Sequence, residues 1–274
     1  MSRRTWIVVL VSVVVVVVLA LTLSFLLFTR RQSAAQPVSA QHASYSQTQK
    51  DGTTNAIKLL VFSKTAGFRH ASIKDGIIAL KKLGFENKVA IDFTENAAMF
   101  TDANLKQYNA VVFLMATGDL LNNDQQSAFE RYIRAGGGYA GVHSASDAEY
   151  KWAWYGKLVG AFFHDHPHIQ QATIHVLDHN HPSTASLPDQ WVRTDEWYNF
   201  ATNPSNSVHV LMTVDEKTYT GGKMGTSHPI AWYHQYDGGR SWYTAIGHTS
   251  ESYYDHLFLS HLWGGIMYAA GVRE

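Results

Sequence analysis

The sequence predicts an α/β fold in which a mostly parallel central sheet is flanked by helices and carries an added antiparallel hairpin region. Three observations predict it. Short continuous apolar runs alternate with amphipathic segments between about residues 58 and 142, which is typical of β-α-β units. Most of these runs are followed by turn residues. Beyond about residue 170, apolar runs follow one another more closely, which indicates additional strands.

The first predicted unit is a buried strand followed by a helix. Residues 58–62 form an apolar run that fits a strand buried on both faces. A helix is expected to start at Ser72, because Asp75 three residues later would complete a capping box. Gly84 is expected to end that helix.

The same signals assign the rest of the chain. A second helix is predicted to start at Asn123, with Gln126 as its capping partner, and to stop at the glycines 136–138. The glycine-rich turn at 237–239 predicts a hairpin. The remaining predicted elements are strands at 88–93, 110–115, 139–142, 172–177, 208–214, 230–236 and 242–246, and a final helix from about 254 to 270.

The chain begins with a long apolar segment. Residues 6–28 would extend about 34 Å as a helix, enough to cross a bilayer core of about 30 Å. Residues 1–31 are therefore predicted to be a transmembrane anchor, or alternatively a signal segment cleaved after the small residues at 38–40. Residues 32–55 are polar and predict a flexible stalk, and 56–274 are predicted to form one domain.

These segments imply a location. An uncleaved anchor would make the membrane a partner and place an extracytoplasmic domain on its surface, whereas a cleaved signal would give a secreted or periplasmic protein.

The amino-acid composition limits the chemical classes of ligand that the protein is expected to bind. The net charge is zero and only 16% of residues are charged, so nucleic-acid binding is not expected. With 15 His, 8 Trp and 14 Tyr residues, the chain suits a neutral, hydroxylated ligand.

Polar side chains follow the predicted parallel strands where each strand ends. In an open parallel sheet, ligands bind beyond the carboxyl ends of the strands, so these side chains are candidates for one shared site. They are Arg69 and His70, Asp119, His143, Ser144 and Asp147, and His248. Two further polar clusters lie between them, at 164–168 and 193–198.

Several segments resemble the ThuA-like (trehalose utilisation) family, whose fold is that of the class I glutamine amidotransferases and is flavodoxin-like. The resemblance runs across about 57–271 and implies a role in sugar metabolism without naming a reaction. The matching segments are GFRHASI (67–73), GGGYAGVHSASD (136–147), WYGKLVGAFFHDHP (154–167), HPST (181–184), TDEWYNF (194–200) and AIGH (245–248).

The comparison with amidotransferases excludes one activity. Those enzymes carry a cysteine nucleophile on a sharp turn after a strand, and here His143 occupies that turn. The sequence has no cysteine, so the thioester chemistry of a glutaminase is excluded. His248 lies near the family position of the triad histidine. Glu251 follows three residues later, which departs from the usual spacing.

The resulting hypothesis is an extracytoplasmic carbohydrate-active enzyme of the hydrolase or isomerase/lyase class, acting on a disaccharide or an oxidised sugar derivative. His143 and His248 would transfer protons, assisted by Asp195 or Glu196. Adjacent residues of an extended chain point to opposite faces, so at most one of these carboxylates should enter the site. The predicted sugar-binding residues are Arg69, His70, Asp119, Ser144, Asp147, His166, Trp197 and Tyr198.

Two alternatives remain open at this stage. One is a non-catalytic sugar-binding or sensing module. The other is a metal-dependent hydrolase, for which His164, His166 and His168 are candidate ligands of a divalent metal, because alternate residues of a strand face the same side. His166 is favoured because it belongs to the family's His-Pro motif. The sequence leaves the oligomeric state undetermined.

Overall fold

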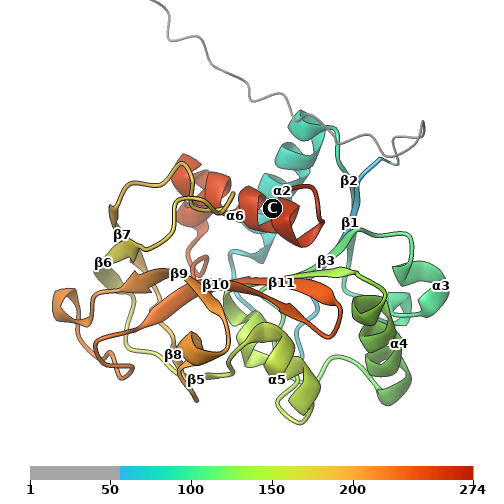
Figure 1. Ribbon diagram of the computed structural model, residues 1–274, viewed down its shortest axis with the longest axis horizontal. Coiled ribbons are helices and arrows are strands. Elements are labelled where there is room, and N and C mark those ends of the chain that lie inside the picture. The colour runs from blue at the N-terminus through green and yellow to red at the C-terminus, as the bar shows by residue number, and fades with distance from the viewer. Residues whose placement is uncertain (1–55, 274) are drawn as a thin grey trace, which may run out of the picture. The chain divides into compact units, whose positions relative to one another are not determined.

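The computed structural model describes residues 56–273, which form a large sheet covered by helices on both faces (Figure 1). The strands are β1 (Lys58–Phe62), β2 (Ala90–Thr94), β3 (Ala110–Leu114), β4 (Gly138–Val142), β5 (Phe163–Asp165), β6 (Gln170–Val176), β7 (Gln190–Asp195), β8 (Asn199–Phe200), β9 (His209–Val214), β10 (Pro229–Tyr236) and β11 (Gly239–Thr244). The helices are α2 (Ile73–Asn87), α3 (Asp102–Leu105), α4 (Asn123–Arg134), α5 (Ala153–Val159) and α6 (His256–Ala269).

The main sheet has two halves that differ in strand direction. Its nine strands follow the order β2-β1-β3-β4-β11-β10-β9-β6-β7. The first five run parallel in the order of a doubly wound sheet. The other pairings are antiparallel. The predicted α/β class is therefore confirmed, but the sheet is largely antiparallel at one edge, which is more than the added hairpin that the sequence suggests.

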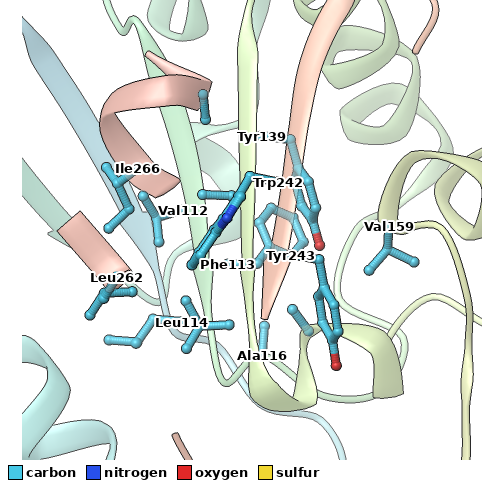
Figure 2. Close-up of a cluster of buried hydrophobic side chains, with 14 of the residues drawn as sticks. Val112, Phe113, Leu114, Ala116, Tyr139, Val159, Trp242, Tyr243, Leu262 and Ile266 are labelled. Carbon is cyan, nitrogen blue, oxygen red and sulfur yellow. The ribbon is translucent and has the colours of Figure 1, made fainter. Parts of the chain in front are cut away.

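The core lies on both faces of the central strands. Alternate residues of a strand point to opposite faces, so Val112 and Leu114 face Leu262 and Ile266 of α6, whereas Phe113 packs on the other side (Figure 2). Its ring lies 5.5 Å from that of Tyr139. Burial on two faces explains why β3 is an uninterrupted apolar run.

Helix α2 begins after Ser72 as predicted, but long-range contacts replace the predicted capping box and move the predicted end of the helix. Ser72 makes no side-chain capping bond; its hydroxyl donates to the carbonyl of His248 at 2.6 Å. Asp75 accepts from Ser250 instead of completing a capping box. Helix α2 continues past Gly84 to Asn87. A Cβ at position 84 would lie 2.7 Å from Ile91 of β2. The glycine therefore permits close helix–sheet packing and does not end the helix.

The second predicted capping pair is displaced by one residue. The capping box of α4 joins Asn122 and Gln125, whereas the sequence suggests Asn123 and Gln126. Strand β7 is not among the predicted strands. Its residues alternate between exposed and buried, as in other strands, but each face mixes apolar and polar residues, so the sequence shows no apolar alternation.

The expectation of a transmembrane helix, a signal anchor and a membrane partner is corrected by the structure. None of the helices between residues 56 and 273 combines the length and apolarity needed to span a bilayer. The segment 1–31, to which that expectation refers, and the predicted stalk 32–55 lie outside the described residues. The predicted location therefore stays a prediction.

Candidate metal-binding site

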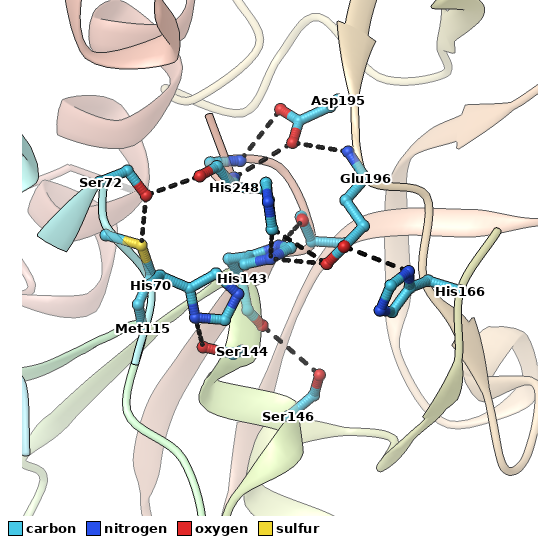
Figure 3. A network of polar contacts seen from close by, with 12 residues as sticks. His70, Ser72, Met115, His143, Ser144, Ser146, His166, Asp195, Glu196 and His248 are labelled. Carbon is cyan, nitrogen blue, oxygen red and sulfur yellow. Dashed lines mark hydrogen bonds and ion pairs between the residues drawn. The ribbon is translucent and has the colours of Figure 1, made fainter. Parts of the chain in front are cut away.

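Three histidines meet because they follow neighbouring strands. His70 lies between β1 and α2, His143 comes directly after β4, and His248 follows β11. Strands β1, β3, β4 and β11 are consecutive and parallel in the sheet, so their carboxyl ends share one edge. The sequence-based expectation that these loops converge is met for these three side chains (Figure 3).

A carboxylate from the antiparallel half completes the cluster. Glu196 follows β7, and its Oε2 lies 3.0 Å from Nδ1 of His248 and 3.4 Å from Nε2 of His143. These two imidazole nitrogens are 3.2 Å apart. One ligand-type atom from each of His70, His143, Glu196 and His248 lies within 4.8 Å of all the others. We call these four residues the histidine–glutamate cluster.

The distances among three members of the histidine–glutamate cluster fit a shared cation. Tetrahedral ligands at about 2.0–2.1 Å from a zinc ion are about 3.3 Å from one another. The three distances among His143, Glu196 and His248, from 3.0 to 3.4 Å, match that spacing. The same distances also suit hydrogen bonds, so hydrogen bonding alone is a second account of the geometry.

The orientation of His143 favours a ligand role. Its Nδ1 lies 2.6 Å from the carbonyl oxygen of Ala245, which can only accept, so Nδ1 carries the proton and donates. In the neutral ring, Nε2 then directs a lone pair at the cluster. Metal-binding histidines usually have this arrangement, with a carbonyl or carboxylate holding the other ring nitrogen. His143 also has φ of 50°, a left-handed conformation that is rare outside glycine and often found at functional sites.

The protonation states of two members suit cation binding. Burial, together with the nearby rings of His143 and His248, lowers the pKa of His70 to about 3, so this imidazole is neutral at physiological pH. Burial opposes ionisation of Glu196, but its interactions with the side chains of His143 and His248 outweigh burial and hold the pKa of Glu196 below its usual value. Neutral imidazoles and a carboxylate are the forms that bind divalent metals.

The pKa of His248 shows that the carboxylate of Glu196 favours a positive charge beside it. Burial tends to lower the pKa of His248, but the hydrogen bond and charge of Glu196 outweigh burial and raise it. Glu196 therefore stabilises a positive charge at this point of the site, whether on an imidazolium or on a metal ion.

Asp195 fixes the backbone of the cluster rather than joining it. Its buried carboxylate accepts from the backbone N–H groups of Glu196, Gly247 and His248 at 2.9, 3.1 and 3.1 Å. It also forms an ion pair with the buried Arg193 at 3.1 Å. Asp195 thereby joins the end of β7 to the loop after β11. The expectation that at most one of Asp195 and Glu196 enters the site agrees with this geometry.

Other predicted residues lie around the cluster. Nδ1 of His166 is 3.1 Å from Oε1 of Glu196. The buried ring of Tyr198 lies 4.3 Å from that of His143. The hydroxyl of Ser144 is 3.4 Å from Nδ1 of His70, which leaves Nε2 of His70 as the nitrogen that can face the cluster.

Several predicted sugar-binding residues have other partners. Arg69 pairs with Glu95 at 2.7 Å, and Asp119 pairs with Lys151 at 2.8 Å. Trp197 is a core residue whose indole N–H donates to the carbonyl of Gln170.

Asp147 is half-buried, and burial raises its pKa. Its carboxylate accepts a hydrogen bond from Tyr150 at 2.6 Å. The structure thus gives Asp147 a local partner and shows no direct contact with the histidine–glutamate cluster.

The predicted metal trio of His164, His166 and His168 is not brought together. Strand β5 ends at Asp165, so the three residues do not share one face of an extended strand. His164 is exposed and lies 3.1 Å from Asp165, whereas His166 turns toward Glu196. The sequence signal that finds the better ligand set is the position of each residue after a strand, rather than the spacing of histidines in one segment.

The fold and site define an α/β protein with three histidines and one glutamate gathered at the carboxyl edge of its sheet. The trehalose utilisation (ThuA) family model matches residues 58–269, and the chain belongs to this family. No functionally curated protein matches it.

Solved structures share the fold. A ThuA-like protein from Bacteroides uniformis ATCC 8492 is 23% identical, with a TM-score of 0.67 over 81% of this chain and 94% of that one. A ThuA-like protein from Parabacteroides merdae ATCC 43184 is 20% identical, with a TM-score of 0.64 over 80% and 91%. The family suggests a carbohydrate-related role.

Proposed function

We propose that this protein is a carbohydrate-active enzyme whose reactive centre is one divalent metal ion held by His70, His143, Glu196 and His248. The observation that carries the proposal is the convergence of these ligand-type side chains from four separate loops, with distances of 3.0 to 3.4 Å among three of them. The family's link to trehalose utilisation supports a sugar as the substrate.

The ligand atoms of the site limit which metal ions it would bind. Three imidazole nitrogens and one carboxylate oxygen suit zinc, iron, cobalt or manganese better than calcium or magnesium, which prefer oxygen. Such an ion, when bound, would polarise a hydroxyl or carbonyl oxygen of the sugar. Oε1 of Glu196 and the half-exposed His166, 3.1 Å apart, are placed to hold or move a proton beside that oxygen.

We also propose that the fold of this protein and the fold of the class I amidotransferases descend from a common ancestor. The strand order of the parallel half and the left-handed backbone of His143 at the turn after β4 support this relation. Because the sequence has no cysteine, the corresponding turn would serve a different reaction.

A second candidate function uses the same residues without a metal. Glu196 lies within hydrogen-bonding distance of His248 and close to His143, so it could orient both imidazoles for acid and base catalysis on a sugar. The two candidates differ in one measurable property, which is whether turnover requires a bound ion.

The deciding experiment combines metal analysis with a product assay. Protein purified without added metals is analysed by mass spectrometry of its metal content, stripped with a chelator, and reloaded with zinc, manganese, iron(II) or cobalt. Each form is incubated with trehalose and with oxidised trehalose, and products are detected by mass spectrometry. We expect one ion per chain and turnover that depends on it.

A matched pair of variants tests the assignment of residues. Glu196→Gln keeps the size of the side chain but removes its charge, so metal binding and turnover should both fall by a factor of at least about 100, since a ligand should matter at least as much as its supporting residues. Glu251→Gln changes an exposed residue and should behave as the wild type. Full turnover by metal-free protein would contradict the metal centre and favour the second candidate.

A further inference from the structure

An exposed aromatic ring lies directly beside the buried cluster. The side chain of Phe68 is 66% exposed, whereas His70 is only 5% exposed. Their rings are 4.8 Å apart in an edge-to-face arrangement. Single exposed apolar side chains are common and need no function, so the position of Phe68 matters only if other features support it.

The loop that carries Phe68 is held firmly. The backbone N–H groups of Ala66 and Gly67 both donate to the carbonyl of Thr117, at 2.7 and 3.3 Å. In return, the hydroxyl of Thr117 donates to the carbonyl of Phe68 at 2.8 Å. Gly118 packs so closely that a Cβ there would lie 2.8 Å from the nitrogen of Gly67. The ring of Phe68 is thus presented to solvent from a preorganised backbone, which lowers the entropic cost of binding a ligand.

The charges on the same loop suit a neutral ligand. Arg69 pairs with Glu95 at 2.7 Å, and the ammonium group of Lys64 donates to the carbonyl of Leu120 at 2.8 Å. The charge of Arg69, next to Phe68 in the chain, is thus balanced by a carboxylate, and the ammonium group of Lys64 is held at Leu120, which favours a neutral molecule over a phosphate at the ring.

We infer that Phe68 is the stacking platform for a pyranose ring whose hydroxyl or carbonyl oxygen reaches the histidine–glutamate cluster. This inference rests on the proposed carbohydrate function and adds a specificity-determining residue to it. One face of a pyranose presents C–H groups that pack on an aromatic ring at about 4 Å. A sugar stacked on Phe68 would therefore lie next to His70 and present its polar groups to the cluster.

The test measures sugar binding by calorimetry on the full chain loaded with zinc. The probes are trehalose, methyl α-D-glucopyranoside and sorbitol, an open-chain polyol that has hydroxyls but no ring face. Phe68→Ala should weaken binding of both pyranosides about three- to tenfold, with little effect on sorbitol. Phe68→Trp should keep or strengthen pyranoside binding.

The control is Phe85→Ala. Phe85 is 87% exposed and lies on α2 about 18 Å along the helix from its first residue, so its variant should bind sugars as the wild type does. Zinc affinity and melting temperature should be unchanged in all three variants, because Phe68 and Phe85 contribute little to the core.

The outcomes separate this inference from the proposed function. If Phe68→Ala binds both pyranosides as tightly as the wild type does, the platform is refuted while the metal centre stands. If no variant binds zinc but pyranoside binding still depends on Phe68, the metal centre is refuted and the platform stands. If the wild type binds zinc but neither pyranoside, the platform is overturned and the metal centre stands.

Discussion

Asp195 and Glu196 are adjacent carboxylates that perform different tasks because the extended backbone directs them to opposite sides. Glu196 faces three imidazoles, whereas Asp195 is fully buried against Arg193 and the backbone of the loop after β11. The sequence predicts this division, since alternation follows from strand geometry. It cannot tell which of the two enters the site, because that depends on which face of β7 turns toward β11.

Replacing Asp195 with Asn should destabilise the protein and weaken metal binding. The substitution removes the nearer counter-charge of the buried Arg193 and leaves only Asp255, 3.5 Å away, which should lower the free energy of unfolding by about 3 kcal/mol. It should also lower zinc affinity about 10- to 100-fold, because the NH2 group that replaces Oδ2 cannot accept from the backbone N–H of Gly247, the residue before His248. Urea denaturation and zinc titration measure the two effects.

The matched control is the double variant Arg193→Met with Asp195→Asn. Removing both charges should recover about 1 kcal/mol or more of the lost stability, while zinc affinity stays low because the acceptor for the N–H of Gly247 is still absent. Equal stability of the single and double variants would show that the buried ion pair is not the cause of the loss.

At the scale of elements, the apolar strands are predictable from the sequence, and the contacts of residues at helix ends are not. Strands β1 and β3 are buried on both faces and read as continuous apolar runs. Ser72 marks the start of α2 correctly, but tertiary contacts with His248 and Ile91 determine what Ser72 bonds to and why Gly84 does not end the helix. Such contacts join positions that are distant in sequence, so no local pattern reports them.

Helix α6 packs on the sheet through a glycine. A Cβ at Gly265 would lie 2.0 Å from the indole of Trp242 on β11. Alanine is the better helix former by about 1 kcal/mol, but the clash should outweigh that gain. We expect Gly265→Ala to lower the free energy of unfolding by about 1–3 kcal/mol, as measured by urea denaturation.

An exposed position of the same helix provides the comparison. Ser260→Ala removes an exposed hydrogen bond to Ser186 at 2.7 Å without entering the sheet interface, so its stability should stay within about 1 kcal/mol of the wild type. If Gly265→Ala were as stable as Ser260→Ala, the close approach of α6 to Trp242 would not be a constraint on the fold.

At the scale of the whole molecule, the site depends on both halves of the sheet. The order of the parallel strands brings His70, His143 and His248 together, and the sequence predicts this because each follows a strand. Glu196 reaches the same edge only because the antiparallel half, including the unpredicted β7, returns the chain to the loop after β11. A search along the sequence therefore finds the histidines of the site more readily than it finds their carboxylate partner.

The fold also buries histidines that lie away from the cluster, and these should make stability depend on pH. Burial lowers the pKa of His261 to about 3 and that of His181 to about 4. In the unfolded chain both should titrate near 6.5. Below that pH the unfolded state binds protons that the folded state does not, so stability is full above about pH 6.5 and falls as the pH drops toward 4.

The expected loss between pH 7 and pH 5 is about 2 kcal/mol for each of the two residues. His261→Gln removes one of them, so the variant, although less stable at pH 7, should lose about 2 kcal/mol less than the wild type over this range. His256→Gln changes a side chain of the same helix that is 91% exposed and should keep the wild-type slope. The histidine–glutamate cluster is identical in all three proteins, so its own titration cancels in the comparison. Urea denaturation at several pH values measures the slopes, and a slope for His261→Gln equal to that of the wild type would mean that His261 is not held neutral by burial.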